Sequence, residues 1–239
     1  MRAAVYTGTR NLYEHMMPAM KSLLCNSEVD KIYLLIEDDS FPYPLPPEAE
    51  TINVSNQKWF KKDGPNNDTQ FKPLCLMRAA YTKVLPKEAD KILQLDVDTV
   101  VVRNIDRLWD VDLSGKYFAA VPELKGDYRP YGPVYYNAGV MMLNLDEIRK
   151  DKMDDTLIEF LNTEKVPYID QDAWNKYGTD KAAALDVAYN ECFVTGYTSR
   201  PRIVHFAGFK DWTTNRSMWR REYLDQYDRM TLESILKRR

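Results

Sequence analysis

The chain has 239 residues, of which 44% are hydrophobic and 29% are charged, and its formal net charge at pH 7 is −3. This length and this balance are typical of one sizeable α/β domain with a soluble surface. The acidic balance argues against a nucleic-acid-binding protein. The sequence contains no run of 18 apolar residues, so we expect no membrane-spanning helix.

The apolar run at the N-terminus is too short for a secretory signal, so we expect a cytoplasmic protein. The cysteines are widely spaced and odd in number, and none forms a metal-type pair. We expect all three to be reduced and buried: Cys25, Cys75 and Cys192.

The chain opens with the pattern of a nucleotide-binding βα unit. A short strand, Ala3–Thr7, precedes a polar turn that contains Gly8 and Thr9, and a helix with apolar residues at helical spacing follows over residues 12–24. Backbone N–H groups at such a turn can meet a ligand. The Gly-x-Gly-x-x-Gly fingerprint is absent, which argues against a dinucleotide fold.

Strands and helices alternate along the rest of the chain, which predicts an α/β fold. Residues 55–70 are polar, and we expect a surface loop there, with a lid as the alternative. We expect Asp146 to cap the helix that follows it. The further strands are expected over residues 31–36, 51–54, a run ending near 96, 117–121, 135–145 and 202–208. The further helices are expected over residues 71–85, 154–161, from 168, and in a tail from 216.

The most informative stretch runs from residue 91 to residue 102, where two acids stand between two apolar runs. We expect a buried strand that ends near Asp96 and an extended segment from Thr99. In an open α/β sheet, ligands bind outside the carboxyl ends of the strands. Asp96 and Asp98 would there be oxygen ligands for a divalent cation that holds a diphosphate. A pair of acids that simply faces solvent is the alternative.

Two other Asp-x-Asp triplets occur in the chain. Asp110 and Asp112 precede a Ser-Gly pair, which predicts a solvated surface turn. Asp170 and Asp172 begin a helix, where acids suit the N-terminus electrostatically. Only the triplet at residues 96–98 lies between strongly apolar runs, where like charges repel and burial disfavours ionisation. A bound cation would relieve both costs.

The chain has only two histidines. His15 is expected to be an ordinary helix-face residue. His205 ends an apolar strand, and we expect it to emerge at the same rim of the sheet as Asp96 and Asp98. Two carboxylates and one imidazole suit Mn²⁺, with Mg²⁺ as the alternative ion. Lys210 would then be a point charge for a phosphate. A purely structural histidine is the other interpretation of His205.

Five motifs follow one another over residues 3–212. They are Thr7…Tyr13, Leu95-Asp96-Val97-Asp98-Thr99, Tyr136-Asn137-Ala138-Gly139-Val140, Asp170-Gln171-Asp172-x-x-Asn175 and His205-Phe206-Ala207-Gly208…Lys210-Asp211-Trp212. This ordered set resembles glycosyltransferase family 8, which includes glycogenin and bacterial lipopolysaccharide galactosyl- and glucosyltransferases.

The resemblance implies one GT-A-type domain over residues 1–212, with a mixed, mostly parallel sheet flanked by helices, and a helical tail over 213–239. It implies a UDP-hexose donor, Mn²⁺ dependence and retention of anomeric configuration. The implied metal ligands are Asp96, Asp98 and His205. The implied donor-binding residues are Thr7, Gly8, Thr9 and Tyr13 for uridine, Arg78, Asn137 and Asp170 for the sugar, Gly208 and Lys210 for the diphosphate, and also Val97, Ala138 and Gly139.

The resemblance assigns Gln171 to the reacting face of the sugar. Because an amide is a poor nucleophile, we expect front-face attack by the acceptor hydroxyl, with the leaving phosphate taking the proton. Gln171 would position or stabilise the sugar, and Asp170 would hold its hydroxyls. A double displacement with Asp170 as nucleophile is the alternative.

Two rival functions stay open at this point. A sugar nucleotidyltransferase would usually have a Gly-rich, basic first loop, and only Arg10 is basic here. A catalytically idle module that binds nucleotide-sugars or glycans is the second rival. No motif identifies the acceptor, which could be a glycan, a lipid-linked glycan or a protein. The basic tail, including Arg220 and Arg221, would suit weak contact with an anionic membrane surface, with a solvated helix as the alternative.

Overall fold

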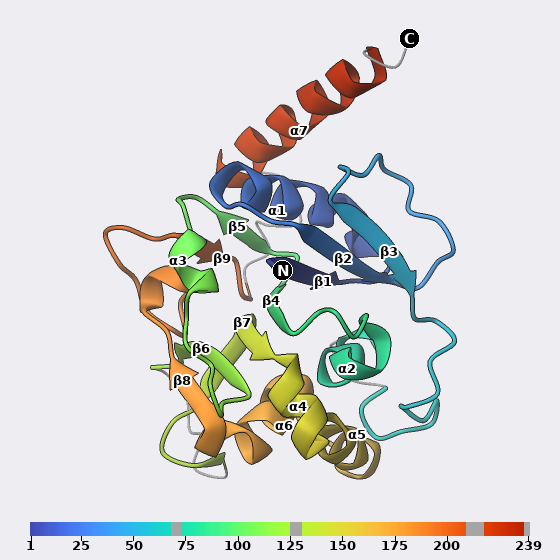
Figure 1. Ribbon diagram of the computed structural model, residues 1–239, viewed down its shortest axis with the longest axis vertical. Helices are drawn as coiled ribbons and strands as arrows, with labels where there is room; N and C mark the ends of the chain where they lie inside the picture. The colour runs from blue at the N-terminus through green and yellow to red at the C-terminus, as the bar shows by residue number, and fades with distance from the viewer. Residues whose placement is uncertain (68–72, 125–130, 209–217, 237–239) are drawn as a thin grey trace.

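The computed structural model describes residues 1–67, 73–124, 131–208 and 218–236 (Figure 1). Its centre is a seven-stranded sheet in the order β3-β2-β1-β4-β7-β6-β8. Only β7 runs antiparallel to its neighbours, and the other six strands point the same way. The expected mixed, mostly parallel sheet is confirmed. The strands are β1 (Ala3–Thr7), β2 (Lys31–Ile36), β3 (Ala49–Asn53), β4 (Lys91–Leu95), β6 (Phe118–Pro122), β7 (Tyr136–Asn144) and β8 (Ala182–Ala184).

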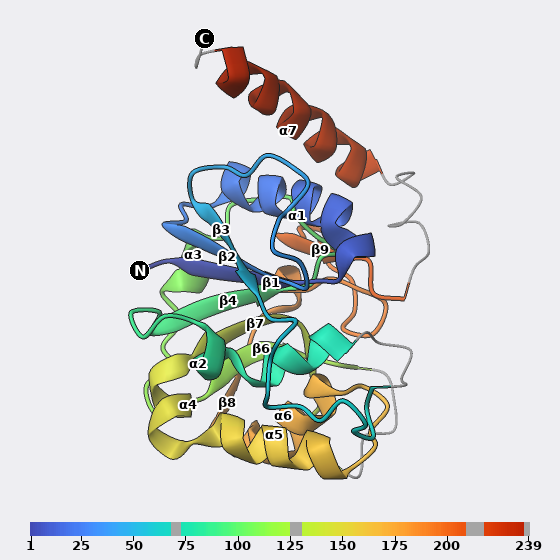
Figure 2. The same ribbon diagram turned by 90° about the vertical axis from the view of Figure 1, so that its right-hand side faces the viewer.

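Helices cover both faces of this sheet (Figure 2). Ala4 and Tyr6 of β1 pack in one layer, while Ala3 and Val5 pack in the opposite layer. Because both faces are covered, the inner strands are mostly apolar rather than alternating. The helices are α1 (Tyr13–Asn26) on the first face, and α4 (Leu145–Asp151), α5 (Met153–Thr163) and α6 (Asp170–Tyr177) on the second.

A separate two-stranded antiparallel sheet is formed by β5 (Thr99–Val101) and β9 (Ile203–His205). Thr99 lies opposite His205 in this ladder, and the N–H of Phe206 donates to the carbonyl of Asp98 at 2.9 Å. His205 emerges beside Asp96 and Asp98, as expected, but it comes from this second sheet and not from the main one. It reaches the two acids because β9 pairs with the segment that directly follows them.

The single helix expected over residues 71–85 is also wrong, and residues 71 and 72 lie outside the described part of the chain. A 3₁₀ segment, η2 (Pro73–Ala79), and a short helix, α2 (Tyr81–Val84), are separated at Ala80, where φ is −130° and ψ is 27°. Leu74, Met77 and Tyr81 are spaced by three and four residues, which fits either type of helix. The apolar pattern alone therefore cannot distinguish them. The other short segments are η1 (Arg10–Leu12), α3 (Asp106–Trp109), η4 (Thr179–Lys181) and η5 (Val187–Tyr189).

Asn144, rather than Asp146, caps α4. Its side-chain oxygen accepts the N–H of Glu147 at 3.2 Å. β7 runs directly into α4, so the helix begins earlier than the sequence suggests and Asp146 lies inside its first turn.

The three cysteines are free thiols, but the expectation that all are buried is wrong. Cys25 on α1 is exposed and Cys75 is half-buried, whereas Cys192 is buried as expected.

The last helix, α7 (Met218–Leu236), begins against α1 (Figure 2). Among the described residues, no helix has both the length and the apolar composition needed to cross a lipid bilayer. The division into a domain over residues 1–212 and a tail over residues 213–239 stays a prediction.

Candidate active site

The carboxyl ends of β1 and β4 and the beginning of β7 meet at one edge of the main sheet. Tyr6 lies opposite Leu95 in the ladder, and Leu95 lies opposite Val140. The N–H of Asp96 donates to the carbonyl of Gly139 at 2.8 Å, which fixes the turn after β4 against β7. This is the edge at which open α/β sheets bind ligands.

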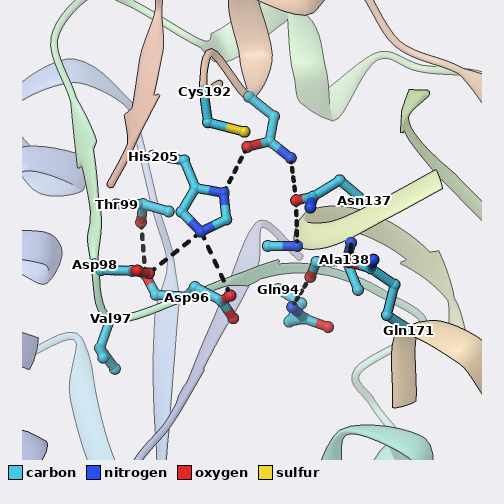
Figure 3. Close-up of polar contacts among 12 residues, drawn as sticks. Gln94, Asp96, Val97, Asp98, Thr99, Asn137, Ala138, Gln171, Cys192 and His205 are labelled. Atoms are coloured by element: carbon cyan, nitrogen blue, oxygen red, sulfur yellow. Dashed lines mark hydrogen bonds and ion pairs between the residues drawn. The ribbon is translucent and has the colours of Figure 1, made fainter. Parts of the chain in front are cut away.

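Asp96, Asp98 and His205 converge at this edge (Figure 3). One potential ligand atom from each residue lies within 4.8 Å of the others. Nε2 of His205 is 3.3 Å from Oδ1 of Asp98 and 3.6 Å from Oδ2 of Asp96. The hydroxyl of Thr99 donates to the carbonyl of Asp96 at 2.7 Å and closes the turn that presents both acids.

The charges of this cluster suit a divalent cation. Burial raises the pKa of Asp96, although Arg78 opposes the shift. Burial also disfavours ionisation of Asp98, but His205 outweighs it and lowers the pKa of that carboxyl. Burial opposes a charged imidazole as well, yet the two carboxylates raise the pKa of His205 well above its usual value. The cluster therefore attracts positive charge, and its donor set of two carboxylates and one imidazole fits Mn²⁺.

Arg78 joins the acid turn to α6. Its Nη1 atom is 2.7 Å from Oδ1 of Asp96, and its Nε atom is 3.0 Å from Oδ2 of Asp170. Nη2 donates to the carbonyl of Ala138 at 2.6 Å. Burial opposes the charge of Arg78, but the two carboxylates raise its pKa and keep it ionised. One guanidinium thus holds three segments of the site in register.

The first turn of α6 places Asp170 and Gln171 beside this arginine. Ile169, just before them, has φ of 45°, which is unfavourable for a β-branched residue and costs about 1–3 kcal/mol. Burial raises the pKa of Asp170 to about 7. Oε1 of Gln171 accepts the N–H of Ala138 at 2.8 Å, and its Nε2 donates to Glu123 at 3.1 Å. The side chain of Gln171 is therefore held at both ends.

A pocket of about 430 Å³ brings most of the predicted site residues together. Its lining includes Arg78, Asp96, Asp98, Asn137, Ala138, Gly139, Asp170, Gln171, His205 and Gly208. The predicted residues that are not part of this lining are Thr7, Gly8, Thr9, Tyr13 and Val97. Lys210 lies outside the described residues.

The loop after β1 lies at the same edge but is fixed by contacts of its own. The hydroxyl of Thr9 donates to Oδ1 of Asn11 at 2.6 Å. The hydroxyl of Tyr13 donates to Oδ2 of Asp38 at 3.0 Å and accepts the N–H of Glu37 at 3.0 Å. The expected role of this loop in binding uridine stays a prediction.

The missing side chain of Gly139 makes room for His205. A Cβ atom at this position would overlap the imidazole ring. The sequence suggested that small residues here would let a ligand approach the backbone. In the structure that space holds the imidazole of a candidate metal ligand, so Gly139 sets where the ring lies.

Val97, between the two acids, packs its side chain into the α1 layer. Its carbonyl accepts Nη1 of Arg220 at 3.3 Å, and Nη2 of the same residue lies 3.1 Å from Nδ1 of His15. Arg220 is fully buried, and burial lowers its pKa to about 10. The expectation that Arg220 faces solvent or a membrane is wrong, because α7 places this cation behind the acid turn.

Sequence reasoning missed two polar residues of the site. Glu123 lines the pocket and accepts hydrogen bonds from Asn137 at 2.7 Å and from Gln171. It directly follows β6, so the rule that functional acids follow strands could have found it. Asn190 follows η5 and contacts both His205 and Asn137. No local pattern signals that contact.

The family model of glycosyl transferase family 8 matches residues 39–216. The glycosyltransferase GlyD of Streptococcus pneumoniae serotype 4 (strain ATCC BAA-334 / TIGR4) is 25% identical over 251 residues, which cover 89% of this chain and 29% of GlyD. The probable galacturonosyltransferase-like 4 of Arabidopsis thaliana is 28% identical over 111 residues, which cover 39% of this chain and 32% of that protein. The chain therefore spans about a third or less of the length of these relatives.

Solved structures share the fold. The galactosyltransferase LgtC in complex with donor and acceptor sugar analogs superposes with a TM-score of 0.73 and 18% identity, and the match covers 94% of this chain and 95% of LgtC. This likeness confirms the expected GT-A-type architecture. The family model spans most of the chain, the resemblance carried by the five motifs is confirmed, and the chain belongs to glycosyl transferase family 8.

Proposed function

We propose that this protein is a Mn²⁺-dependent retaining hexosyltransferase that moves glucose or galactose from a UDP-sugar to an acceptor hydroxyl. The observation that carries the proposal is the convergence of Asp96, Asp98 and His205 in the pocket that Asp170 and Gln171 also line. Membership of glycosyl transferase family 8 supports glycosyl transfer as the reaction. The pocket volume of about 430 Å³ suits a small ligand such as a sugar with its diphosphate.

The reaction breaks the bond between the anomeric carbon and a phosphate oxygen, and the electron pair leaves with UDP. A divalent cation held by Asp96, Asp98 and His205 would neutralise the charge that gathers on the departing diphosphate. The acceptor hydroxyl bonds to the anomeric carbon on the face that UDP leaves, and its proton passes to the leaving phosphate oxygen. The configuration is thereby retained.

The chain's own groups would orient the sugar in this reaction. Gln171 is held between Ala138 and Glu123, so the amide that it brings to the pocket lining has a fixed orientation. Asp170 would hold sugar hydroxyls, and its ion pair with Arg78 restrains it from acting as a nucleophile. Trapping a covalent glycosyl adduct on Asp170 would overturn the front-face mechanism.

The direct test is release of UDP from UDP-glucose and from UDP-galactose in the presence of Mn²⁺. The chain offers a matched pair of variants, because Asp98 and Asp112 both end an Asp-Val-Asp triplet and Asp112 is an exposed turn residue. Asp98→Asn should abolish release, whereas Asp112→Asn should leave it unchanged. Tight binding without release, over a broad acceptor panel, would favour the binding module, and release of pyrophosphate would favour the nucleotidyltransferase.

Thermal unfolding tests the metal separately from turnover. A ligand that binds only the folded state at 100 times its Kd stabilises that state by about 2.7 kcal/mol. Mn²⁺ should therefore raise the Tm, a chelator should reverse the change, and Asp98→Asn should remove it. A larger effect of Mg²⁺ than of Mn²⁺ would assign the alternative ion.

We further propose a cytoplasmic location and an acceptor that is a glycan, a lipid-linked glycan or a protein. Membrane contact through the tail would have to use residues other than Arg220, such as the exposed Arg221. Sedimentation with anionic vesicles would test this contact, and Arg221→Gln should reduce it.

A further inference from the structure

Asn190 has no role in the family motifs that the sequence carries, yet it is fully buried between two residues of the site. Its Oδ1 atom is 2.9 Å from Nδ1 of His205, and its Nδ2 atom donates to Oδ1 of Asn137 at 2.8 Å. Figure 3 shows these contacts as dashed lines that run from His205 to Asn137. One amide therefore touches both the candidate metal centre and the start of β7.

One backbone group determines which atom donates and which accepts in each hydrogen bond between Gly139, Asn137, Asn190 and His205. The N–H of Gly139 can only donate, and its partner is Oδ1 of Asn137 at 3.0 Å. The atom of Asn190 that meets the same oxygen must also donate, so it is the amide nitrogen. The amide oxygen of Asn190 then faces His205, and Nδ1 of that ring must carry the proton.

A second contact fixes Asn137 in the same orientation. Its Nδ2 atom donates to a carboxylate oxygen of Glu123 at 2.7 Å, and a carboxylate can only accept. Flipping the amide of Asn137 would place its oxygen against this carboxylate and its nitrogen against the N–H of Gly139. Two obligate partners thus exclude the flipped arrangement.

The consequence lies at the other nitrogen of the imidazole. With the proton held on Nδ1, Nε2 is the atom that can offer a lone pair, and Nε2 is the atom that faces Asp98 and Asp96. A metal-binding histidine needs its second nitrogen held in this way, because the partner fixes both the tautomer and the ring orientation.

We propose that Asn190 is the positioning residue that fixes the Nδ1–H tautomer of His205 and braces Asn137 with the other end of the same amide. This inference rests on the proposed metal-dependent function, and it adds a link between the cation side and the sugar side of the pocket. Asn190 acts through His205 and Asn137 and does not line the pocket itself.

The first test is the proton on Nδ1, read from the imidazole ¹⁵N signals of the full chain. Only two histidines contribute, and His15→Gln leaves His205 alone. In the neutral imidazole of His205 we expect a protonated Nδ1 and an unprotonated Nε2. The opposite tautomer would overturn the inference, whether or not the protein binds a metal.

Two variants separate the two ends of the amide, with the Kd of Mn²⁺ alone and the KM for the UDP-sugar as readouts. Asn190→Ala should raise the Kd by about 10- to 100-fold and mix the tautomers. Asn190→Asp can still accept from Nδ1 but cannot donate to Asn137. It should hold the Kd within about 3-fold and the Nδ1 proton in place, while the KM rises by about 10-fold.

Asn66→Ala is the matched control, because Asn66 is another buried amide, hydrogen-bonds the backbone of Leu161 and Val166, and lies outside the pocket. It should change neither the tautomer nor the Kd. Equal Kd values for wild type and Asn190→Ala, with Nδ1 protonated in both, would refute the positioning role. Absence of saturable Mn²⁺ binding to the wild type would instead refute the proposed metal-dependent function, and the ¹⁵N measurement would still decide the tautomer.

Discussion

Nη1 of Arg78 lies 2.7 Å from Oδ1 of Asp96, while Oδ2 of the same carboxylate is turned toward His205. The two oxygens of Asp96 therefore have different partners, and only one is directed at the candidate metal position. Because Arg78 also contacts Asp170, the orientation of the metal ligand and that of the first turn of α6 depend on a single side chain.

Arg78→Lys should weaken both the fold and the metal site. An ammonium cannot make the hydrogen bond to Ala138 and the ion pairs with Asp96 and Asp170 at the same time. Losing one interaction of a charged group costs about 1.5–3 kcal/mol. We expect the free energy of unfolding in urea to fall by at least about 2 kcal/mol and the Kd of Mn²⁺ to rise.

Arg149→Lys is the control, because Arg149 also holds backbone carbonyls, those of Pro86 and Ala89, outside the pocket. It should lose stability and keep the Kd, and a similar rise of the Kd in both variants would contradict the specific role of Arg78.

Gly139→Ala should displace the imidazole of His205 without adding a charge or a polar group. The new methyl group would overlap the ring, so the ring must turn or the strand must shift. We expect the Kd of Mn²⁺, measured by titration, to rise by at least about 10-fold.

Gly115→Ala is the matched control for this substitution. Gly115 has φ of 67° and open space around it, so the variant should lose about 1 kcal/mol of stability from backbone strain alone. Its Kd should stay at the wild-type value. An unchanged Kd for Gly139→Ala would mean that the site tolerates a displaced ring.

The acid turn could be predicted because its signal is local. An apolar strand that stops at Asp96, and resumes after Asp98, is visible in a dozen residues. Asp172 could be interpreted as a structural residue at the beginning of a helix, because that signal is also local. In the structure this carboxylate accepts the hydroxyl of Tyr135 at 2.6 Å and the N–H of Tyr168 at 2.8 Å.

The contacts that complete the site are not local, and no spacing rule reaches them. His205 arrives through a ladder between segments about a hundred residues apart, and Asn190 arrives from a 3₁₀ turn with no periodic pattern. Arg220 was expected at the surface because an isolated helix with mixed charge looks solvated. Arg220 is buried because α7 packs against α1, and the sequence of α7 alone does not predict that packing.

Glu123→Gln should slow turnover while leaving the metal site intact. Oε1 of Glu123 accepts hydrogen bonds from both Asn137 and Gln171, and the neutral amide oxygen of a glutamine would accept both bonds more weakly than a carboxylate. Loss of this anchor would let Gln171 shift, and a misplacement of about 1 Å can cost roughly 100-fold. We expect kcat to fall by about that factor and the Kd of Mn²⁺ to stay within about 3-fold. Glu147→Gln, on α4 and outside the pocket, should change neither value. A wild-type kcat for Glu123→Gln would show that Gln171 does not need this partner.

The buried pair of His15 and Arg220 should make stability depend on pH. Burial, and then the nearby guanidinium, lower the pKa of His15 below its usual value of about 6.5. Below that pH the unfolded chain binds a proton that the folded chain resists, so this group lowers the free energy of unfolding as the pH falls, and it has no effect well above pH 6.5.

His15→Gln keeps an acceptor for Arg220 and removes the titration, so the stability advantage of the wild type measured in urea at pH 7.5 should narrow or reverse at pH 5.5. His205 titrates in both proteins and cancels in this difference. Parallel stability curves across that range would show that His15 is not held neutral against Arg220.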